Sequence, residues 1–492
     1  MARHVKFGTP SIAMLDNTAT DSSSSAVKAA NTAEPGRHLG GFLARYDATA
    51  LPQDVVTTTK LFILDTLGVM AGGTRAPGIQ ELAQAVRAME PGGGGIATVL
   101  IGGCSASPAS AALINAATAH ALDFDDTHDT ARVHAFSIVL PAALAAAELR
   151  GGCDGRALLA AVALGSEVFC RLGLAGFNTL ARGWHPTTSY GSLAAAIAAG
   201  RILDLSAEQM TNALGLAYVQ MGGTTQSIID GVLSKRLGSG IAARNGLFAA
   251  QLARFGLTGP WRFLEGEAGL FHLYLQDEVR PEFLVEALGH VWHMLNLSMK
   301  PFPCCRCSHA LIQIGIELHR QGLKPQQIRS GRLLLGAVNH AIVGAAYDPA
   351  HANPVVHAQF NATYAFCRAL IDGEVAIGAF SPDGVRGFAD TLPQRIRCEI
   401  ADDLPAVALA PARIELTLAD SSSLTMSRET MKGAPDEPMT IEEILAKFDA
   451  NMHWGLRARK EDAGAISRLA LSLEAMADAR ALAQTFRAAT TV

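Results

Sequence analysis

The feature that most limits what this chain can fold into is a long stretch of small apolar residues, from Ala106 to Phe255. Within it, residues 142–147 and 193–199 consist only of Ala, Leu and Ile. Alanine has the highest intrinsic helix propensity, and its small side chain lets helices approach closely. The period-two alternation that is typical of strands is nearly absent here. The stretch therefore predicts a tightly packed, mainly helical domain.

The pattern changes near residue 296. Residues 329–343 and 395–400 are β-branched or mixed, and residues 413–420 alternate, meet three serines and resume at 424–426, which predicts a β-hairpin. After Pro438, Thr440 with Glu443 three residues later predicts a capped helix start. We therefore expect a mainly α protein with an inserted α+β domain. The expected parts are a disordered N-terminal extension (1–37), a helical domain from both ends of the chain (38–296 and 439–492), and an α+β domain between them (297–438).

Bulk composition excludes several classes of function. The chain has 492 residues, 49% of them hydrophobic and 17% charged, which is enough apolar material for a large core and favours two domains. A net charge of −5 gives no sign of nucleic-acid or membrane-surface binding. We expect no transmembrane helix, because no uninterrupted apolar run of about 18 residues occurs. The eight cysteines lack the spacing of a disulfide framework, which favours a reducing, cytoplasmic location. Arg3, Lys6 and a serine run leave a transit peptide open, although Asp16 and Asp21 weaken that reading.

One stretch interrupts the apolar background. Residues 120–134 carry four carboxylates, three imidazoles and one guanidinium, between nearly uncharged segments at 111–119 and 136–149. Burying a charge costs several kcal/mol or more unless it is partnered. Such a cluster beside buried helices predicts one wall of an active site, and a solvated turn is the alternative. Within the stretch, we expect Asp125, Asp126 and His128 only to shape the turn, and Asp129 to be solvated.

Two further segments place polar groups at the start of small-residue helices. Residues 183–191 contain His185, which we interpret as a general acid or base, or as part of a helix cap that also could bind an anion. Lys235 and Arg236 form a pair of cations that could clamp carboxylates, with a solvated basic turn as the alternative.

Another segment, residues 300–309, contains three cysteines and His309. Zinc is disfavoured there, because Cys304 and Cys305 are adjacent, whereas paired zinc ligands usually need two or more residues between them. We therefore expect Lys300, Arg306 and His309 to face a substrate.

A last polar segment, residues 360–364, ends in Tyr364. The Tyr364 hydroxyl either reaches the site or is buried with one hydrogen-bond partner. No nucleophile elbow or dinucleotide fingerprint occurs in a suitable context anywhere in the chain. Imidazoles, acids and cations without such motifs fit proton transfer next to a carboxylate.

Read in order, these segments resemble the MmgE/PrpD family, which includes 2-methylcitrate dehydratases, cis-aconitate decarboxylases and an iminodisuccinate epimerase. The resemblance covers roughly residues 38–485. It rests on Asp123-Phe124-Asp125-Asp126-Thr127 with His134, Gly183-Trp184-His185-Pro186-Thr187, Ser234-Lys235, Lys300-Pro301-Phe302-Pro303-Cys304-Cys305 with Ser308-His309, and Phe360 to Tyr364.

The resemblance implies that the α+β domain is a lid over the helical domain, that the active site between them uses no metal or cofactor, and that the protein is a homodimer. Carried over by position, the implied site residues are Asp123, Thr127, His134, His185, Lys235, Lys300 and Tyr364. The sequence departs from the animal decarboxylase of the family at Cys305, where that enzyme has a histidine, and by one extra residue between Asp123 and His134.

We therefore expect a metal-independent lyase that moves protons next to a carboxylate of a small di- or tricarboxylate. The expected catalytic residues are Asp123, His134, His185, Lys235 and Tyr364, and the expected substrate-binding residues are Thr127, Arg236, Lys300, Arg306 and His309. The residues alone do not choose between the reactions, and the breadth of that role in the family that the chain resembles favours a hydro-lyase acting on 2-methylcitrate or citrate. The alternatives are a cis-aconitate decarboxylase that forms itaconate, an epimerase of a dicarboxylate such as iminodisuccinate and, more remotely, a non-catalytic helical binding protein or a zinc hydrolase.

Overall fold

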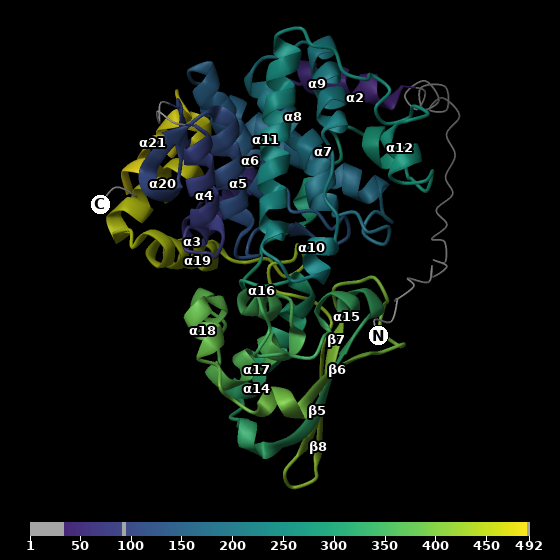
Figure 1. The fold of residues 1–492 in the computed structure, drawn as a ribbon, viewed down its shortest axis with the longest axis vertical. Coiled ribbons are helices and arrows are strands. Elements are labelled where there is room, and N and C mark those ends of the chain that lie inside the picture. The colour runs from purple at the N-terminus through teal and green to yellow at the C-terminus, as the bar shows by residue number, and fades with distance from the viewer. Residues whose placement is uncertain (1–33, 91–94, 490–492) are drawn as a thin grey trace.

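The computed structural model of the chain describes residues 34–90 and 95–489 and is mainly helical (Figure 1). The first 33 residues of the predicted N-terminal extension lie outside the described residues. Helix α2 already begins at Pro35, so helical structure starts before the predicted boundary at residue 38. The helices are α2 Pro35–Arg45, α3 Gln53–Gly73, α4 Ile79–Met89, α5 Pro108–His120, α6 Phe136–Arg150, α7 Gly155–Ala175, α8 Pro186–Ile202, α9 Ala207–Val219, α10 Gln226–Ile229, α11 Ser234–Arg254, α12 Leu270–Leu273, α13 Glu282–Val285, α14 His309–Arg320, α15 Ala337–Val343, α16 Pro354–Gln359, α17 Ala362–Asp372, α18 Pro382–Arg386, α19 Ile441–Leu456, α20 Lys460–Leu471 and α21 Arg480–Ala489.

Strands are short and few by comparison. They are β1 Ala97–Val99, β2 Cys104–Ala106, β3 Thr127–His128, β4 Leu297–Ser298, β5 Ile328–Leu335, β6 Ile396–Ile400, β7 Ala412–Leu418 and β8 Ser423–Arg428. The largest sheet has the order β6-β5-β7-β8, with β5 and β6 parallel and the other neighbours antiparallel. The predicted hairpin is confirmed, because β7 and β8 pair antiparallel around the three serines.

Small residues bring the central helices into close contact, as the alanine-rich sequence predicts. Helix α11 packs against both α5 and α8. A Cβ atom at Gly246 of α11 would overlap the Ala195 side chain and the Ser192 carbonyl oxygen of α8, so only glycine fits this crossing. Helices α3 and α7 are long and apolar enough to cross a membrane, but 72% and 89% of their apolar windows are buried inside the protein, as in core helices.

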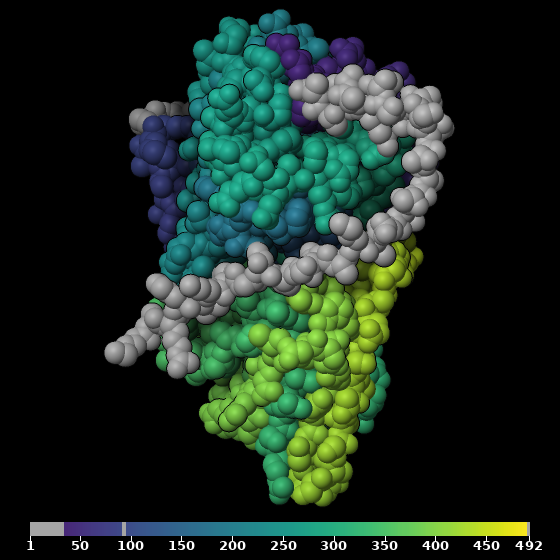
Figure 2. Space-filling model, turned by 90° about the vertical axis from the view of Figure 1, so that its right-hand side faces the viewer, coloured from purple at the N-terminus to yellow at the C-terminus, as the bar shows by residue number. Residues whose placement is uncertain are grey.

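Two hydrophobic clusters form the core. The larger contains buried residues from Leu39 to Met299, together with Ile377 and residues between Ile444 and Ala489. The smaller runs from Cys304 to Met431 and includes buried residues of β5, β6 and β7. In Figures 1 and 2 the smaller cluster belongs to the narrower green to yellow-green part, below the broad helical part. The predicted boundary at 438/439 falls between the two clusters, whereas the one at 296/297 lies a few residues before the larger cluster ends at Met299, and both boundaries stay predictions.

The C-terminal return to the helical part begins as predicted. Thr440 accepts a hydrogen bond from the Glu443 backbone, and the Glu443 side chain accepts one from the Thr440 backbone, which confirms the capping box of α19. Further along α19, the Lys447 ammonium lies 2.7 Å from an Asp65 carboxylate oxygen of α3 and 3.0 Å from the Phe124 carbonyl oxygen. Lys447, from the C-terminal part of the chain, therefore links the loop at Phe124 to Asp65 in the N-terminal part.

Candidate active site

The charged stretch is a buried loop between α5 and α6, which excludes a solvated turn. Asp123, Asp125 and Asp126 are each at most 3% exposed. The Asp126 carboxylate accepts hydrogen bonds from the backbone N–H groups of Ala135 and Phe136, at 2.7 and 3.0 Å, so it caps the start of α6. Burial and the nearby Asp125 carboxylate raise the pKa of Asp126 to about 8. The expectation that Asp126 shapes the turn agrees with this position.

Asp123 joins two lysines that lie far apart in the sequence. One carboxylate oxygen pairs with Lys235 at the start of α11, and the other lies 3.2 Å from Lys300 Nζ. Lys300 also donates to the Asp123 carbonyl oxygen at 2.9 Å. Burial alone would raise the pKa of Asp123, but the two ammonium groups hold this pKa well below its usual range. Burial would likewise lower the pKa of Lys300, but Asp123 and Asp125 raise it overall, so Lys300 stays a cation.

Three imidazoles gather beside this ion cluster. The ring centre of His120 lies 4.9 Å from that of His134 and 6.4 Å from that of His185. Each comes from a helix boundary, because His120 ends α5, His134 precedes α6 and His185 caps α8. The His134 backbone N–H donates to Thr187 Oγ1 at 3.3 Å, which joins the charged stretch to the segment around His185.

Hydrogen bonds fix the tautomers of two of these rings, His134 and His120. His134 Nδ1 lies 2.6 Å from the Asp126 carbonyl oxygen, which can only accept, so Nδ1 carries the proton and Nε2 keeps its lone pair. His120 Nδ1 lies 2.8 Å from an Asp125 carboxylate oxygen and donates to it by the same reasoning. Asp125 is fully buried and lies 3.7 Å from His134 Nδ1, so it serves both rings. The expectation that Asp125 only shapes the turn is therefore wrong.

Burial keeps the three imidazoles neutral. It lowers the pKa of His134 to about 3, and it also lowers the pKa values of His120 and His185. Burial would raise the pKa of Asp125, but the adjacent imidazoles and Lys300 hold it well below its usual range. The resting site therefore contains neutral imidazoles beside ionised carboxylates and lysines, an arrangement suited to proton transfer.

A small cavity borders the ion cluster. Its volume is about 10 Å³, and its lining comes from α5, α11 and α16 with their flanking residues: His120, Ala121, Asp123, Val232, Lys235, Arg236, Val356, Gln359 and Phe360. Such a cavity holds about one water molecule. Because residues 356–360 belong to or adjoin the smaller core cluster, the cavity lies between the two parts of the protein.

Arg236 is a third cation at this cavity. Its guanidinium donates to the Pro77 carbonyl oxygen at 2.7 Å and lies 3.4 Å from Gln359 Oε1. Burial lowers its pKa to about 10, which leaves it charged at neutral pH. Phe360 covers the cavity from the other side, with its ring centre 4.9 Å from Lys235 Nζ. The segment at 360–364 therefore reaches the cavity through Phe360.

Tyr364, from the same segment, lies elsewhere. It is completely buried in the smaller hydrophobic cluster, and its hydroxyl donates to the Ala379 carbonyl oxygen at 2.5 Å. This is the buried tyrosine with one hydrogen-bond partner that the sequence left as an alternative. Its predicted catalytic role stays a prediction, and it does not line the small cavity.

The remaining predicted residues surround the ion cluster without lining the cavity. Thr127 lies in β3, paired with Ser298 of β4, two residues before Lys300. His309 is buried at the start of α14, where Nδ1 accepts from Arg306 at 3.3 Å and Nε2 donates to the Cys304 carbonyl oxygen at 3.2 Å. Arg306 also donates to the Lys432 carbonyl oxygen at 2.8 Å. Arg306 and His309 therefore form hydrogen bonds with backbone carbonyl groups and do not line the small cavity.

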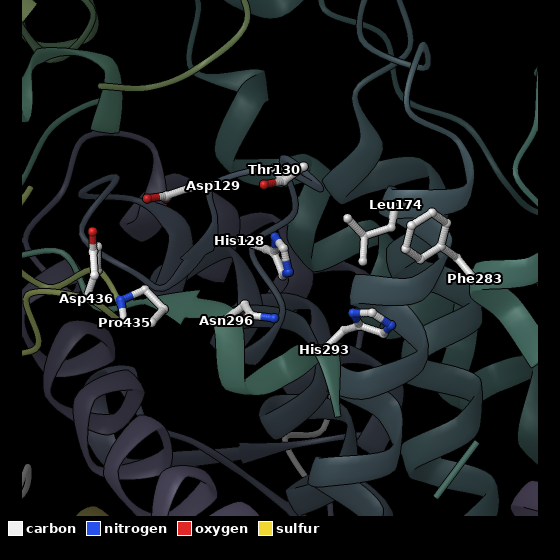
Figure 3. Close-up of a pocket in the computed structure, with 10 residues that line it drawn as sticks. His128, Asp129, Thr130, Leu174, Phe283, His293, Asn296, Pro435 and Asp436 are labelled. Carbon is white, nitrogen blue, oxygen red and sulfur yellow. The ribbon is translucent and has the colours of Figure 1, made fainter. Parts of the chain in front are cut away.

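A second and larger hollow is lined in part by His128 of β3 and by the two residues that follow it (Figure 3). It has a volume of about 350 Å³ and is lined by His128, Asp129, Thr130, Leu174, Phe283, His293, Asn296, Ala434, Pro435 and Asp436. Asp129 accepts from Ser298 Oγ at 2.9 Å and lies 3.5 Å from Arg306, with its side chain 26% exposed. The expectation of a solvated Asp129 is therefore wrong. We call this hollow the β3 cleft.

One group in the described residues has the composition of a metal site. The potential ligand atoms of His120, Asp125 and His134 all lie within 4.8 Å of one another. Lys300 lies close enough to affect the pKa values of Asp125 and His134, and a cation there opposes a second one. The three cysteines at 304–307 form no such group with His309 in the described residues.

The site thus combines three cations that can hold carboxylates with neutral imidazoles that can move a proton. These features suit acid–base chemistry next to a bound carboxylate. The chain belongs to the MmgE/PrpD family, because residues 37–282 match the MmgE/PrpD N-terminal domain and residues 302–473 match the C-terminal domain.

Named relatives narrow the class to lyases. The chain is 30% identical over 429 residues to a cis-aconitate decarboxylase of Aspergillus terreus, covering 81% of this chain and 85% of that one. It is 28% identical over 418 residues to the human cis-aconitate decarboxylase, covering 82% and 84%. The mouse enzyme of the same name is 27% identical over 432 residues, covering 84% and 86%.

Sequence reasoning missed two groups at the centre of this arrangement. His120 and Asp125 both lie inside the charged stretch, but their pairing depends on the path of the loop. Asp123 adopts φ of 51°, a left-handed conformation that aspartate tolerates better than most residues. A signal was present in the sequence, since His120 is the last residue of a helix that has no other ionisable side chain.

Proposed function

We propose that this protein is a cis-aconitate decarboxylase that forms itaconate. The observation that carries the proposal is the Asp123 carboxylate held between Lys235 and Lys300, beside three neutral imidazoles and Arg236. The names of the relatives favour decarboxylation over the dehydration that the family resemblance favoured. Dehydration of 2-methylcitrate or citrate and epimerisation of a dicarboxylate become the alternatives.

The chemistry requires one bond cleavage and one protonation. The bond between the methylene carbon and its carboxylate breaks, carbon dioxide leaves, and the electron pair forms a new carbon–carbon double bond. The electrons of the original double bond move to the carbon next to a retained carboxylate, which takes up one proton. The trianion of cis-aconitate plus one proton thus gives the itaconate dianion and carbon dioxide.

The residues divide into two roles in this scheme. Lys235, Lys300 and Arg236 bind the retained carboxylates and stabilise the negative charge that develops as carbon dioxide leaves. The imidazoles supply the proton. They are neutral in the closed site, but a bound trianion favours their protonated form, so the substrate itself prepares the acid.

The closed cavity also requires a moving part. We infer that residues 297–438 form the lid that opens over the helical part to admit the substrate. We further propose a homodimer in the cytoplasm that uses neither metal nor cofactor. Sedimentation analysis and a metal assay on purified protein test the dimer and the absence of metal.

One experiment separates the candidate reactions. Purified protein is incubated in deuterated water with cis-aconitate, 2-methylcitrate, citrate or iminodisuccinate and followed by NMR. We expect itaconate with one deuterium in its saturated methylene group, with release of carbon dioxide. Turnover of 2-methylcitrate with loss of water and no reaction of cis-aconitate would instead identify a hydro-lyase.

A further inference from the structure

We propose that His120, oriented by Asp125, is the residue that donates the proton to the decarboxylated intermediate. The inference rests on the proposed function and names a catalytic residue that the motifs did not single out. Three observations on the ring support it. His120 lines the small cavity, its Nδ1 is hydrogen-bonded to Asp125, and its Nε2 is buried without a hydrogen-bond partner among the described residues.

His120 is the imidazole that lines the small cavity. It does so together with Asp123, Lys235 and Arg236, the groups that would contact the substrate, whereas neither His134 nor His185 belongs to this lining. His185 is 7% exposed, and its Nδ1 lies 2.9 Å from Thr188 Oγ1 at the start of its own helix. His120 therefore has the most direct position for a proton transfer to the carbon next to a bound carboxylate.

The two nitrogens of His120 have different environments. Nδ1–H donates to the ionised Asp125, so Nε2 is the nitrogen that carries a transferable proton when the ring is charged. Nε2 is buried and has no hydrogen-bond partner among the described residues. An unpartnered buried nitrogen costs free energy unless a ligand or water satisfies it, so the nitrogen is suited to contact the substrate.

Asp125 distinguishes His120 from His134. A carboxylate bonded to Nδ1 stabilises the imidazolium that must exist before the proton is donated. His134 Nδ1 instead donates to a neutral carbonyl oxygen, and its distance to Asp125 is 3.7 Å. The Asp125 partner thus allows His120 to take up the proton first when a trianion arrives.

The charged neighbours of His120 fit this exchange of protons. Asp125 and Asp123 favour its charged form, whereas burial and Lys235 favour the neutral form. On the other sides of the ring lie the imidazoles of His134 and His185. Binding of a substrate carboxylate at Lys235 neutralises the cation that opposes protonation of His120, which couples substrate binding to proton uptake.

The test compares His120→Gln with His128→Gln. Both histidines are buried in the same stretch, but His128 lines the β3 cleft. We expect His120→Gln to lower kcat for cis-aconitate by about 100-fold or more, with KM changed by less than about 5-fold, because general acids contribute about 10²–10⁴-fold. His128→Gln should keep kcat within about 3-fold of the unaltered enzyme. Circular dichroism of both variants checks that they fold.

A second readout isolates the proton transfer. The unaltered enzyme should exchange the saturated methylene protons of itaconate in deuterated water, because this exchange reverses the protonation step. His120→Gln should lose this exchange. Asp125→Asn should keep part of it with a shifted pH profile, and Asp125→Glu should restore more, because a longer carboxylate can still reach the ring.

The outcomes separate the two proposals. If the unaltered enzyme forms no itaconate, the proposed function fails. If it forms itaconate and His120→Gln retains turnover and exchange, the role of His120 fails and the function stands. Independently of turnover, ¹⁵N NMR of histidine-labelled protein should show His120 protonated at Nδ1, and protonation at Nε2 would overturn the inference. Stoichiometric zinc whose removal abolishes activity would also overturn it, because His120 would then be a metal ligand.

Discussion

Two hollows are lined by different residues of the same charged stretch and differ in size and in the groups that line them. The small cavity, about 10 Å³, is lined by Asp123, Lys235 and Arg236, and Lys300 contacts Asp123 next to it. The β3 cleft, about 350 Å³, contains His128, His293 and two carboxylates at its acidic side, with Leu174 and Phe283 opposite. The volumes alone would select the β3 cleft as the active site.

The chemistry selects the small cavity. In the β3 cleft burial lowers the pKa of His128 to about 4, and Arg306 and Ser298 already satisfy one oxygen of Asp129. Beside the small cavity, by contrast, two lysines pair with the buried Asp123 carboxylate, and His120 lines the cavity with two further imidazoles close to its ring. An enzyme that closes over its substrate leaves little volume when empty and closed. The density of partnered charge is therefore the better guide to the site.

The largest expected effect would separate the two hollows by activity. Lys300→Met removes one cation from Asp123 and should lower kcat/KM for cis-aconitate by about 10²–10³-fold, the usual loss in rate when one group that stabilises developing negative charge is removed. Lys235→Met is a second variant, and its lysine is less deeply buried. His293→Ala in the β3 cleft should change kcat/KM by less than about 3-fold. Steady-state kinetics with itaconate detected by NMR measures kcat/KM for all three variants. A larger loss of kcat/KM in His293→Ala than in the lysine variants would assign the reaction to the β3 cleft.

A second comparison concerns two ion pairs that contact the charged loop. Lys447 pairs with Asp65 next to Phe124, and Arg306 lies next to Asp129 at the β3 cleft. Lys447→Met leaves Asp65 without its cation and should lower the free energy of unfolding by about 3–5 kcal/mol. Asp129→Asn, on the side of the β3 cleft, should cost only about 1 kcal/mol, because its side chain is partly exposed. Urea unfolding of both variants gives the two values. Equal losses of unfolding free energy in the two variants would show that the buried Lys447–Asp65 pair matters no more for stability than the partly exposed Asp129.

Acid should destabilise the protein because two buried histidines, His134 and His128, resist protonation in the folded state. His134 has a folded pKa of about 3 against an ordinary value of 6.5, so the unfolded chain binds the extra proton as pH falls below 6.5. Stability is therefore fully present above pH 6.5 and is lost by about 1.4 kcal/mol per pH unit as pH falls toward 3.

His134→Gln should remove that part of the slope, as measured by urea unfolding between pH 4.5 and 8. His128→Gln should remove a similar slope that ends near pH 4, the lowered pKa of His128. At pH 8 each variant gives its pH-independent difference from the unaltered protein. A slope between pH 4.5 and 6.5 that neither variant changes would contradict neutral burial of these imidazoles.

The smallest expected effect concerns Tyr364. Tyr364→Phe leaves the Ala379 carbonyl oxygen without its donor and should lower the free energy of unfolding by about 1–2 kcal/mol. Because the hydroxyl points into the smaller core, kcat should stay within about 3-fold. Paired kinetic and unfolding measurements decide between this supporting role and the catalytic role that the family resemblance implies. A loss of kcat of about 100-fold would restore the catalytic assignment.

Local patterns in the sequence determined much of the architecture. Alanine-rich runs, the alternation before the three serines, and the pairing of Thr440 with Glu443 each reflect interactions within a few residues, which is why the helical part, the hairpin and the start of α19 were predictable. The segments that carry Asp123, His185, Lys235 and Lys300 could also be identified, because charges between apolar helices require partners.

Only the tertiary structure decided which polar groups meet. It paired His120 with Asp125, brought Phe360 rather than Tyr364 to the cavity, and placed Arg306 and His309 on backbone groups. These outcomes depend on the path of loops and on the crossing of helices far apart in the sequence. Residue types determine what chemistry is available, but the direction in which a buried side chain points is set by the packing around it.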